Sequence, residues 1–139
     1  MDPETATERA NSYKSDHSRF IAHAGGELDG HRYTNSLEAL DHSYRNGYRL
    51  FELDFIKTSD NHFVTSHDWI LWRTQTGYED SIPPTLAEFK KQKILGKYTG
   101  ISMHDLNLWF VEHPDAILVS DKINEPKKFT AQFIAPDLD

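Results

Sequence analysis

The sequence predicts an α/β domain organised around a parallel β-sheet, and three observations support this fold class. Short apolar segments alternate with amphipathic segments of helical period from residue 18 onward. The segment 49–56 carries apolar residues on both faces of a strand, which is typical of a strand buried in a parallel sheet. The helices between the strands begin at residues that can cap the free N–H groups of a first helical turn. Together these features indicate successive βα units.

The first βα unit is delimited by local signals. A strand is expected over 18–23, and the helix that follows is expected over 36–46. Asn35 is placed to cap this helix, and Glu38 completes a capping box. Gly47 then suits the left-handed conformation that ends many helices.

The rest of the chain continues the alternation in a less regular order. Thr85 and Glu88 repeat the capping-box spacing, and Pro114 ends the helix that precedes it. The expected elements are, in chain order, the strand 49–56, an extended segment at 63–67, a helix after Pro83-Pro84, a helix over 103–113, a strand over 116–121 and a helix from Pro126. Three main strands form part of a sheet but do not close a barrel.

Composition limits the class of protein. The 139 residues include 15 basic and 22 acidic side chains, a net charge of −7, and 37% hydrophobic residues, which suits one packed domain. An acidic chain without a basic stripe is not expected to bind duplex nucleic acid. No segment approaches the roughly 20 apolar residues of a membrane span, and residues 1–17 form a polar tail without the features of a secretory signal. We therefore expect a soluble protein, with the cytoplasm favoured. The absence of cysteine excludes disulfides, thiolate metal ligands and a cysteine nucleophile.

Two acidic residues lie two positions apart on the strand 49–56. Glu52 and Asp54 therefore point to the same face of that strand. Carboxylates placed side by side repel each other, and a hard divalent cation such as Mg²⁺ or Ca²⁺ would compensate that repulsion. The alternative is that each acid pairs with Lys or Arg at an exposed edge, and the spacing alone leaves both interpretations open.

Two histidines also fall at the ends of extended segments. His23 ends the first strand and His67 ends the segment 63–67, while Asp121 ends the last main strand. The carboxyl ends of parallel strands lie on one side of the sheet, so these residues should converge with the Glu52–Asp54 pair. Two imidazoles beside a divalent cation can act as base and acid in the cleavage of a phosphodiester. For each histidine the alternative is an ordinary surface or loop histidine.

Two further pairs of residues have both a functional and a structural interpretation. Gly25 and Gly26 follow His23 and could let backbone N–H groups approach a phosphate, but a tight turn explains them equally well. Trp69 and Trp72 follow His67 and could line a pocket, although aromatic residues at this spacing more often belong to a core.

Five short motifs, in order, resemble those of the glycerophosphodiester phosphodiesterase family. They are IAHAGG at 21–26, TNSLEA at 34–39, FELD at 51–54, VTSHD at 64–68 and IPPTL at 82–86. This family belongs to the phosphatidylinositol-phospholipase-C-like phosphodiesterases, and the resemblance extends from about residue 20 to residue 124.

The resemblance implies a TIM-barrel fold and hydrolysis of glycerophosphodiesters with a divalent cation. By position, it implies His23 and His67 as the acid and the base. It implies Glu52 and Asp54 as metal ligands, with Asp121 where the family has a third acidic ligand.

The sequence departs from the family pattern at its phosphate-binding positions. Ala24 stands where the family usually has an arginine, so a phosphate clamp is missing unless Arg32 or Lys122 replaces it. Lys122 follows Asp121 directly, whereas the family places a lysine two positions after its acidic residue. Its contact with a phosphate is therefore a weak expectation, as is that of the two glycines.

The chain is also short for a barrel of about 250 residues and eight strands. Residues 18–139 should form an incomplete barrel domain, a truncated TIM barrel of about three βα units. Leu50 and Ile117 should then point toward an interior that this chain does not fill. We expect that surface to be covered by a missing C-terminal portion, by a second copy of the chain or by rearrangement.

The function expected from these features is metal-dependent hydrolysis of a small phosphodiester. Two alternatives stay open. One is a catalytically silent module that binds the phosphodiester and the metal. The other is a phospholipase-type phosphodiesterase of the same superfamily.

Overall fold

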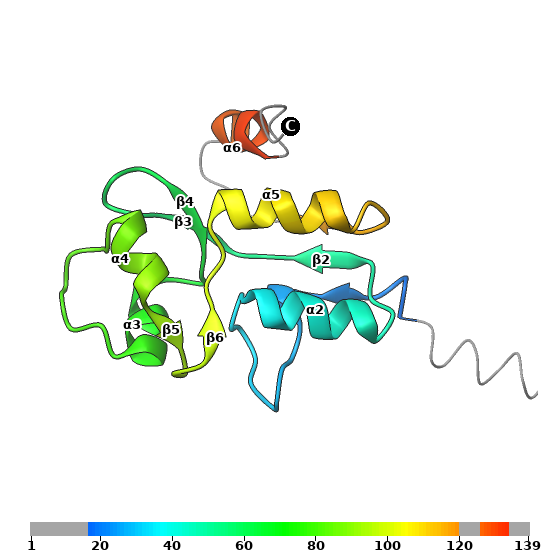
Figure 1. Cartoon of the computed structure of the whole chain (residues 1–139), viewed down its shortest axis with the longest axis horizontal. Coiled ribbons are helices and arrows are strands. Elements are labelled where there is room, and N and C mark those ends of the chain that lie inside the picture. Colours follow the sequence, from blue (N-terminus) through cyan, green and yellow to red (C-terminus); the bar gives the residue numbers. More distant parts are fainter. Residues whose placement is uncertain (1–16, 120–125, 134–139) are drawn as a thin grey trace, which may run out of the picture.

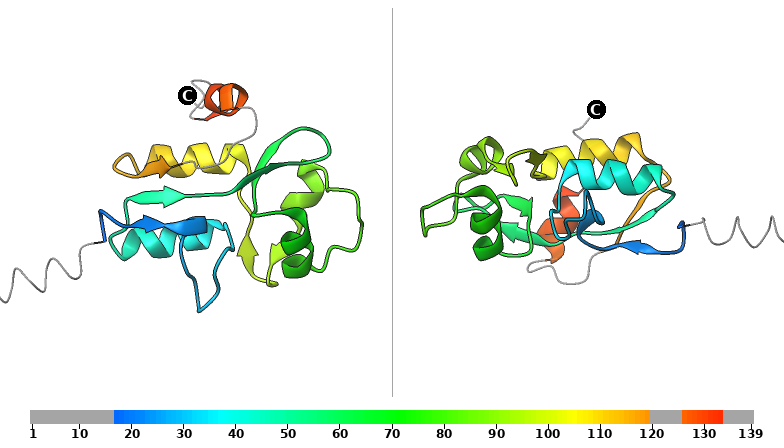
Figure 2. Two further views of the ribbon diagram at one scale, coloured as in Figure 1. Left: turned by 180° about the vertical axis from the view of Figure 1, so that it is seen from behind. Right: turned by 90° about the horizontal axis from the view of Figure 1, so that it is seen from below.

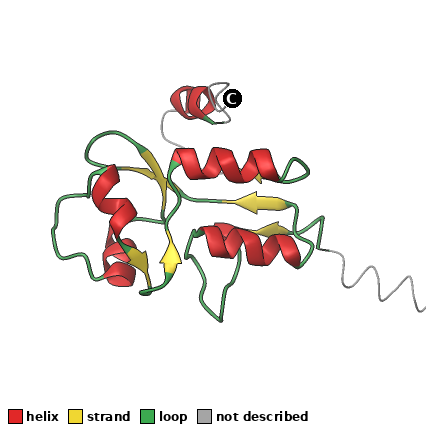
Figure 3. Cartoon of the chain, viewed as in Figure 1, coloured by secondary structure: helices red, strands yellow, loops and turns green. Residues whose placement is uncertain are grey.

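The computed structural model describes residues 17–119 and 126–133, so the predictions at Asp121 and Lys122 lie outside the described residues. The elements (Figure 1, and by type in Figure 3) are, in chain order, β1 (Ile21–Ala22), the short 3₁₀ turn η1 (His23–Gly25), α2 (Leu37–Arg45), β2 (Leu50–Glu52), β3 (Phe55–Lys57), β4 (Phe63–Thr65), α3 (Trp69–Thr76), α4 (Leu86–Lys91), β5 (Lys93–Ile94), β6 (Tyr98–Thr99), α5 (Met103–Glu112), β7 (Ile117–Val119) and α6 (Pro126–Gln132). None of the described helices is long and apolar enough to cross a membrane.

The centre of the fold is a parallel sheet with the strand order β1-β2-β7. In its register, Ala22 lies beside Phe51, and Phe51 lies beside Leu118. The neighbouring row joins Ile21, Leu50 and Ile117. The predicted parallel α/β architecture is confirmed.

Helices α2 and α5 cover one face of this sheet. Figure 2 shows them side by side, and the indole N–H of Trp109 on α5 donates a hydrogen bond of 2.8 Å to Asp41 on α2. Phe51 of β2 is fully buried between the sheet and these helices, where its ring lies 5.1 Å from that of Trp109. This apolar packing is the main core of the molecule.

The opposite face of the sheet is open. Ile117 is 57% exposed and Ile21 is 37% exposed, and Leu50 between them is half-buried. An apolar row across a parallel sheet is normally buried, because parallel sheets are covered on both faces. The expectation that this face is left unfilled therefore agrees with the structure.

The predicted strand 49–56 is wrong in length, because it is broken in the middle. β2 ends at Glu52, and β3 begins at Phe55 and pairs antiparallel with β4 outside the main sheet. At the break, the backbone N–H of Asp54 donates to the side chain of Asn35, and its carbonyl accepts the N–H of Ser66. These bonds take the backbone groups that would otherwise continue the parallel ladder.

The beginning of α2 differs from its prediction by one residue. Ser36, not Asn35, caps the helix, since its hydroxyl accepts the N–H of Ala39 at 3.2 Å. Glu38 makes no capping box, because its carboxylate binds the backbone N–H and the hydroxyl of Thr99 at 2.8 and 2.7 Å. Asn35 is thereby free to bind elsewhere.

The helix predicted after Pro83-Pro84 is confirmed as α4. Thr85 caps it by accepting the N–H of Glu88 at 3.2 Å. The helix predicted over 103–113 is α5, which Ser102 and Asp105 begin with a capping box.

Helix α3 was not predicted, and it forms a second core with α4 and the β3–β4 hairpin. Trp72 is 1% exposed, and its ring stacks on that of Phe89 at 5.6 Å. Trp69 packs edge-on against Trp72 at 5.3 Å. The core interpretation of these tryptophans is therefore the correct one.

Candidate active site

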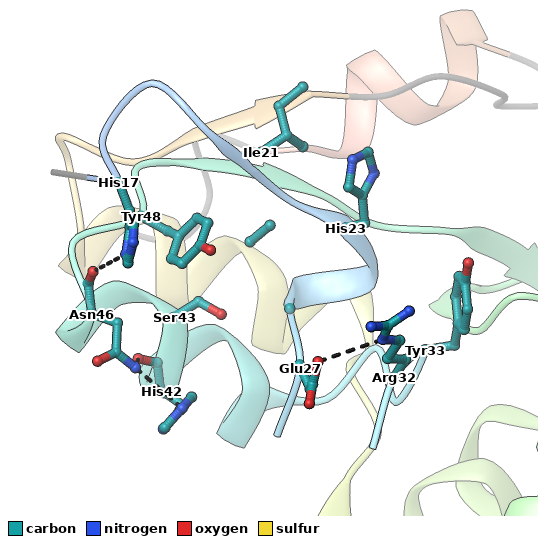
Figure 4. Close-up of a pocket in the computed structure, with 12 residues that line it drawn as sticks. His17, Ile21, His23, Glu27, Arg32, Tyr33, His42, Ser43, Asn46 and Tyr48 are labelled. Atoms are coloured by element: carbon teal, nitrogen blue, oxygen red, sulfur yellow. Dashed lines mark hydrogen bonds and ion pairs between the residues drawn. The ribbon is translucent and has the colours of Figure 1, made fainter. Parts of the chain in front are cut away.

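His23 lies at the carboxyl end of β1, in the turn η1. Its side chain is exposed and lines a cavity of about 490 Å³ between β1 and α2. Figure 4 shows His23, Arg32 and Tyr33 gathered at one end of this cavity. The other end is lined by His17, His42, Ser43, Asn46 and Tyr48.

Glu52 is tied to the turn that carries His23. Its Oε2 accepts the backbone N–H of Ala24 at 3.1 Å, and Glu52 is half-buried. Ala24 is buried and adopts a left-handed conformation with φ 52° and ψ 33°, which aims this N–H at the end of β2. The next strand therefore places a carboxylate beside the residue that follows His23.

Asp54 is held by a residue that sequence reasoning assigned only to a helix cap. Asn35 accepts the backbone N–H of Asp54 at 3.0 Å, and its Nδ2 donates to Oδ2 of Asp54 at 3.3 Å. The asparagine at position 35 is itself the sequence signal that could have indicated its contact with Asp54. Asn35 has a φ of 48°, a conformation that asparagine adopts more readily than most residues.

His67 lies two residues after the end of β4 and pairs with its neighbour Asp68. Nδ1 of His67 and Oδ2 of Asp68 are 2.7 Å apart. This hydrogen bond is the largest cause that raises the pKa of His67 above its ordinary value, and burial opposes it. The carboxylates of Asp54 and Glu52 raise that pKa further by their charge. The site thus brings Glu52, Asp54 and His67 into one electrostatic neighbourhood.

Tyr33 contacts His67 and lines the same cavity as His23, and it was not singled out in the sequence. Its ring lies edge-on to that of His67 at 5.8 Å, and it also lines the cavity beside His23. Gln75 of α3 donates to its backbone carbonyl at 3.3 Å. Tyr33 is half-exposed, so it is available to a ligand bound between the histidines.

The chemistry of the acidic pair suits a hard cation, although the described residues do not complete a metal site. Within the described ranges, neither Glu52 nor Asp54 forms an ion pair with Lys or Arg. Their hydrogen bonds come from the neutral N–H groups of Ala24 and Asn35. The same part of the chain contains no group of three or more His, Asp or Glu side chains that could hold a metal ion. Asp121, the third expected ligand, stays a prediction.

The model of the glycerophosphoryl diester phosphodiesterase family matches residues 24–130, which is well over half of the chain. The chain belongs to the glycerophosphoryl diester phosphodiesterase family. The resemblance carried by the motifs is thereby confirmed.

Solved glycerophosphoryl diester phosphodiesterase structures share the fold. One from Parabacteroides distasonis matches with 24% identity and a TM-score of 0.59, over 81% of this chain and 40% of that one. One from Galdieria sulphuraria matches with 19% identity and a TM-score of 0.59, over 76% of this chain and 43% of that one. One from Agrobacterium tumefaciens matches with 17% identity and a TM-score of 0.61, over 80% of this chain and 48% of that one. Comparison with curated proteins gives no match.

These neighbours are TIM barrels, and the chain spans less than half of the length of each. The partial-barrel prediction is therefore confirmed. It also accounts for the open apolar face of the sheet, which faces the interior of a complete barrel.

The two glycines of this glycerophosphoryl diester phosphodiesterase motif have a packing explanation. A Cβ on Gly26, whose φ is 104°, would lie 2.1 Å from Oγ of Ser43. That hydroxyl donates to the carbonyl of Gly25 at 2.7 Å, so the turn after His23 lies against α2. This contact supports the tight-turn interpretation and leaves phosphate binding by these N–H groups untested.

Arg32, one of the two residues expected to replace the arginine of the family motif, stays a prediction in that role. It lines the same cavity as His23, and its Nε is 3.4 Å from the carboxylate of Glu27. Its side chain is 77% exposed, so it can turn toward an anion at small cost. Ala24 itself is buried, and its backbone N–H donates a hydrogen bond to Glu52.

Proposed function

We propose that this chain carries the two catalytic histidines and part of the metal site of a metal-dependent phosphodiesterase. Its substrates are glycerophosphodiester-like compounds. The observation that supports it most is geometric: Glu52 accepts the N–H of Ala24 beside His23, and Asn35, bonded to the carbonyl of Ala24, holds Asp54. The charges of both carboxylates also favour the protonated form of His67. Family membership supports the same reaction class.

The carboxylates of Glu52 and Asp54 are the residues that would hold the cation, together with Asp121. Mg²⁺ or Ca²⁺ fits, because both prefer carboxylate oxygens. The chemistry that such a cation supplies when bound is neutralisation of the nonbridging phosphate oxygens.

The two imidazoles would move the protons of the reaction. His23 takes a proton from the water that attacks phosphorus as a new P–O bond forms. His67 donates a proton to the alkoxide that leaves when the other P–O bond breaks, a role that suits its raised pKa. Tyr33 would orient His67, and Arg32 would contact the phosphate from the cavity beside His23.

Hydrolysis of glycerophosphocholine, whose alkoxide leaving group needs a proton, tests this proposal with Mg²⁺ and with EDTA. His23→Ala and His67→Ala should each lower the rate by about 10²–10⁴-fold, the usual contribution of a general acid or base. His104→Ala is the matched control, because His104 is an exposed histidine on α5. Turnover that resists EDTA, or His67→Ala at the wild-type rate, would contradict the proposal.

Ala24 supports a second candidate function, a silent module that binds the cation and a phosphodiester. The buried methyl group of Ala24 replaces the arginine that the family uses at this position. Calorimetry with Mg²⁺ separates the two functions. Binding that Glu52→Gln abolishes, without hydrolysis by a protein containing the whole barrel, identifies the module.

A further inference from the structure

Asn35 is buried at the junction of the segments that carry the candidate active-site residues. It is 0% exposed, although it lies in a loop before α2. Its backbone N–H donates to the carbonyl of Ala24 at 3.2 Å, next to His23. Its own carbonyl accepts the hydroxyl of Thr65 at 2.7 Å, two residues before His67. One residue thus links the turn after β1 with the end of β4.

Within the described residues, the side chain of Asn35 hydrogen-bonds to Asp54 alone. Oδ1 accepts the backbone N–H of Asp54 at 3.0 Å, and Nδ2 donates to the carboxylate Oδ2 at 3.3 Å. A side-chain amide that binds both the backbone and the carboxylate of one residue restricts rotation about the χ1 angle of that residue. Among the described residues, no hydrogen-bond donor reaches the other carboxylate oxygen of Asp54.

The position of Asp54 explains why such a restraint matters. Asp54 lies in the break between β2 and β3, where no strand ladder fixes its backbone. It is half-buried, so without the amide its carboxylate could turn toward solvent. Residues that hydrogen-bond a metal ligand orient it, and their loss typically weakens metal binding by about 10–100-fold.

We propose that Asn35 is a positioning residue, whose side-chain amide holds the Asp54 carboxylate in the orientation that binds the divalent cation. This inference rests on the proposed function for the role of Asp54. The placement of the carboxylate by the amide does not depend on catalysis and can be measured separately.

The experiment compares the wild type with Asn35→Gly and Thr65→Val. Glycine adopts the positive φ of position 35 without strain and removes both side-chain hydrogen bonds to Asp54. Thr65→Val is the matched control, because it removes a buried hydrogen bond to the carbonyl of Asn35 without touching Asp54. Asn35→Ala also removes both side-chain hydrogen bonds, at a cost of about 1 kcal/mol for its positive φ, and it serves if the glycine variant does not fold.

Two readouts are taken on each variant. Three-bond NMR couplings between the Asp54 Cγ and its backbone N and carbonyl carbon report the χ1 rotamer, and calorimetry with Mg²⁺ reports affinity. We expect one Asp54 rotamer in the wild type and in Thr65→Val. In Asn35→Gly we expect averaged couplings and an affinity about 10–100-fold weaker.

Unchanged couplings in Asn35→Gly would overturn the proposal, whatever the affinity. Averaged couplings with an unchanged Mg²⁺ affinity would also overturn it, because the orientation would then not serve the cation. If the wild type binds no Mg²⁺, the metal dependence of the proposed function and the contribution of Asn35 to cation binding are both refuted. Averaged couplings in Asn35→Gly would then still support the placement of the Asp54 carboxylate by Asn35.

Discussion

Nδ1 of His67 lies 2.7 Å from Oδ2 of Asp68, and the other carboxylate oxygen of Asp68 accepts the N–H of Leu71 at 2.6 Å as the N-cap of α3. A single aspartate therefore orients the histidine and begins the helix behind it. The candidate acid His67 is therefore linked through Asp68 to helix α3, which packs in the second core.

Asp68→Asn should lower the pKa of His67, because it removes the carboxylate that raises this pKa most. Asparagine caps helices as well as aspartate does, so α3 is retained. If His67 is the acid, the alkaline limb of the pH–rate profile moves to lower pH by the same amount. An NMR titration of the imidazole measures the shift, with His104 as an internal control.

Asp68→Asn should also change how the unfolding free energy of the protein depends on pH. The pKa of His67 is higher in the folded protein, so the pair stabilises the fold fully below the ordinary pKa of histidine. This stabilisation is lost as the pH rises through the folded value. Asp68→Asn should therefore destabilise the protein at acidic pH more than at alkaline pH. An equal loss of unfolding free energy at both pH values would show that the ion pair is not its cause.

Gly26→Ala should destabilise the protein by roughly 3 kcal/mol or more. The added Cβ would meet Oγ of Ser43 at 2.1 Å, and φ of 104° is strained for any other residue. Gly30→Ala is the matched control, because φ there is 80° and no atom lies within 4 Å of the added Cβ. It should cost only about 1 kcal/mol. Urea denaturation measures both values, and equal losses would show that contact with α2 is unimportant.

Trp72→Ala should cost about 3–5 kcal/mol of unfolding free energy, since the side chain fills the second core against Phe89. Ile70→Ala on the same helix should change it by less than about 0.5 kcal/mol, because Ile70 is 72% exposed. Thermal or urea unfolding distinguishes the two. Similar losses would mean that α3 does not pack through Trp72.

The helices with capping signals and the parallel strands could be predicted because their causes are local. Thr85 and Glu88 lie within one turn, and the run of apolar residues at 49–56 marks a buried strand wherever it pairs. The break at Asp54 could not be predicted, because it depends on a side chain 19 positions earlier in the sequence. Helix α3 was missed although it carries local signals, an N-cap at Asp68 and the left-handed Gly77 at its end. Its packing against Phe89 of α4 depends on the tertiary structure.

The candidate site also contains residues whose positions could be predicted and residues whose positions could not. Strand ends place His23 and Glu52 on one side of the parallel sheet, and this rule needs only the order of the elements. His67 follows β4 of the antiparallel β3–β4 hairpin outside that sheet, so the rule does not account for its position. The partners Asn35 and Tyr33 reach the site through loops with positive φ, whose course the sequence does not specify. Their contacts became visible only in three dimensions.

Paramagnetic Mn²⁺ tests most directly whether Glu52, Asp54 and the two histidines surround one cation. NMR spectra of the imidazoles are recorded at substoichiometric Mn²⁺ for the wild type and for Glu52→Gln. We expect the His23 and His67 resonances of the wild type to broaden before that of His104, and the broadening to disappear in Glu52→Gln. Broadening that is equal at all three histidines, or that survives in Glu52→Gln, would contradict a cation centre at this edge of the sheet.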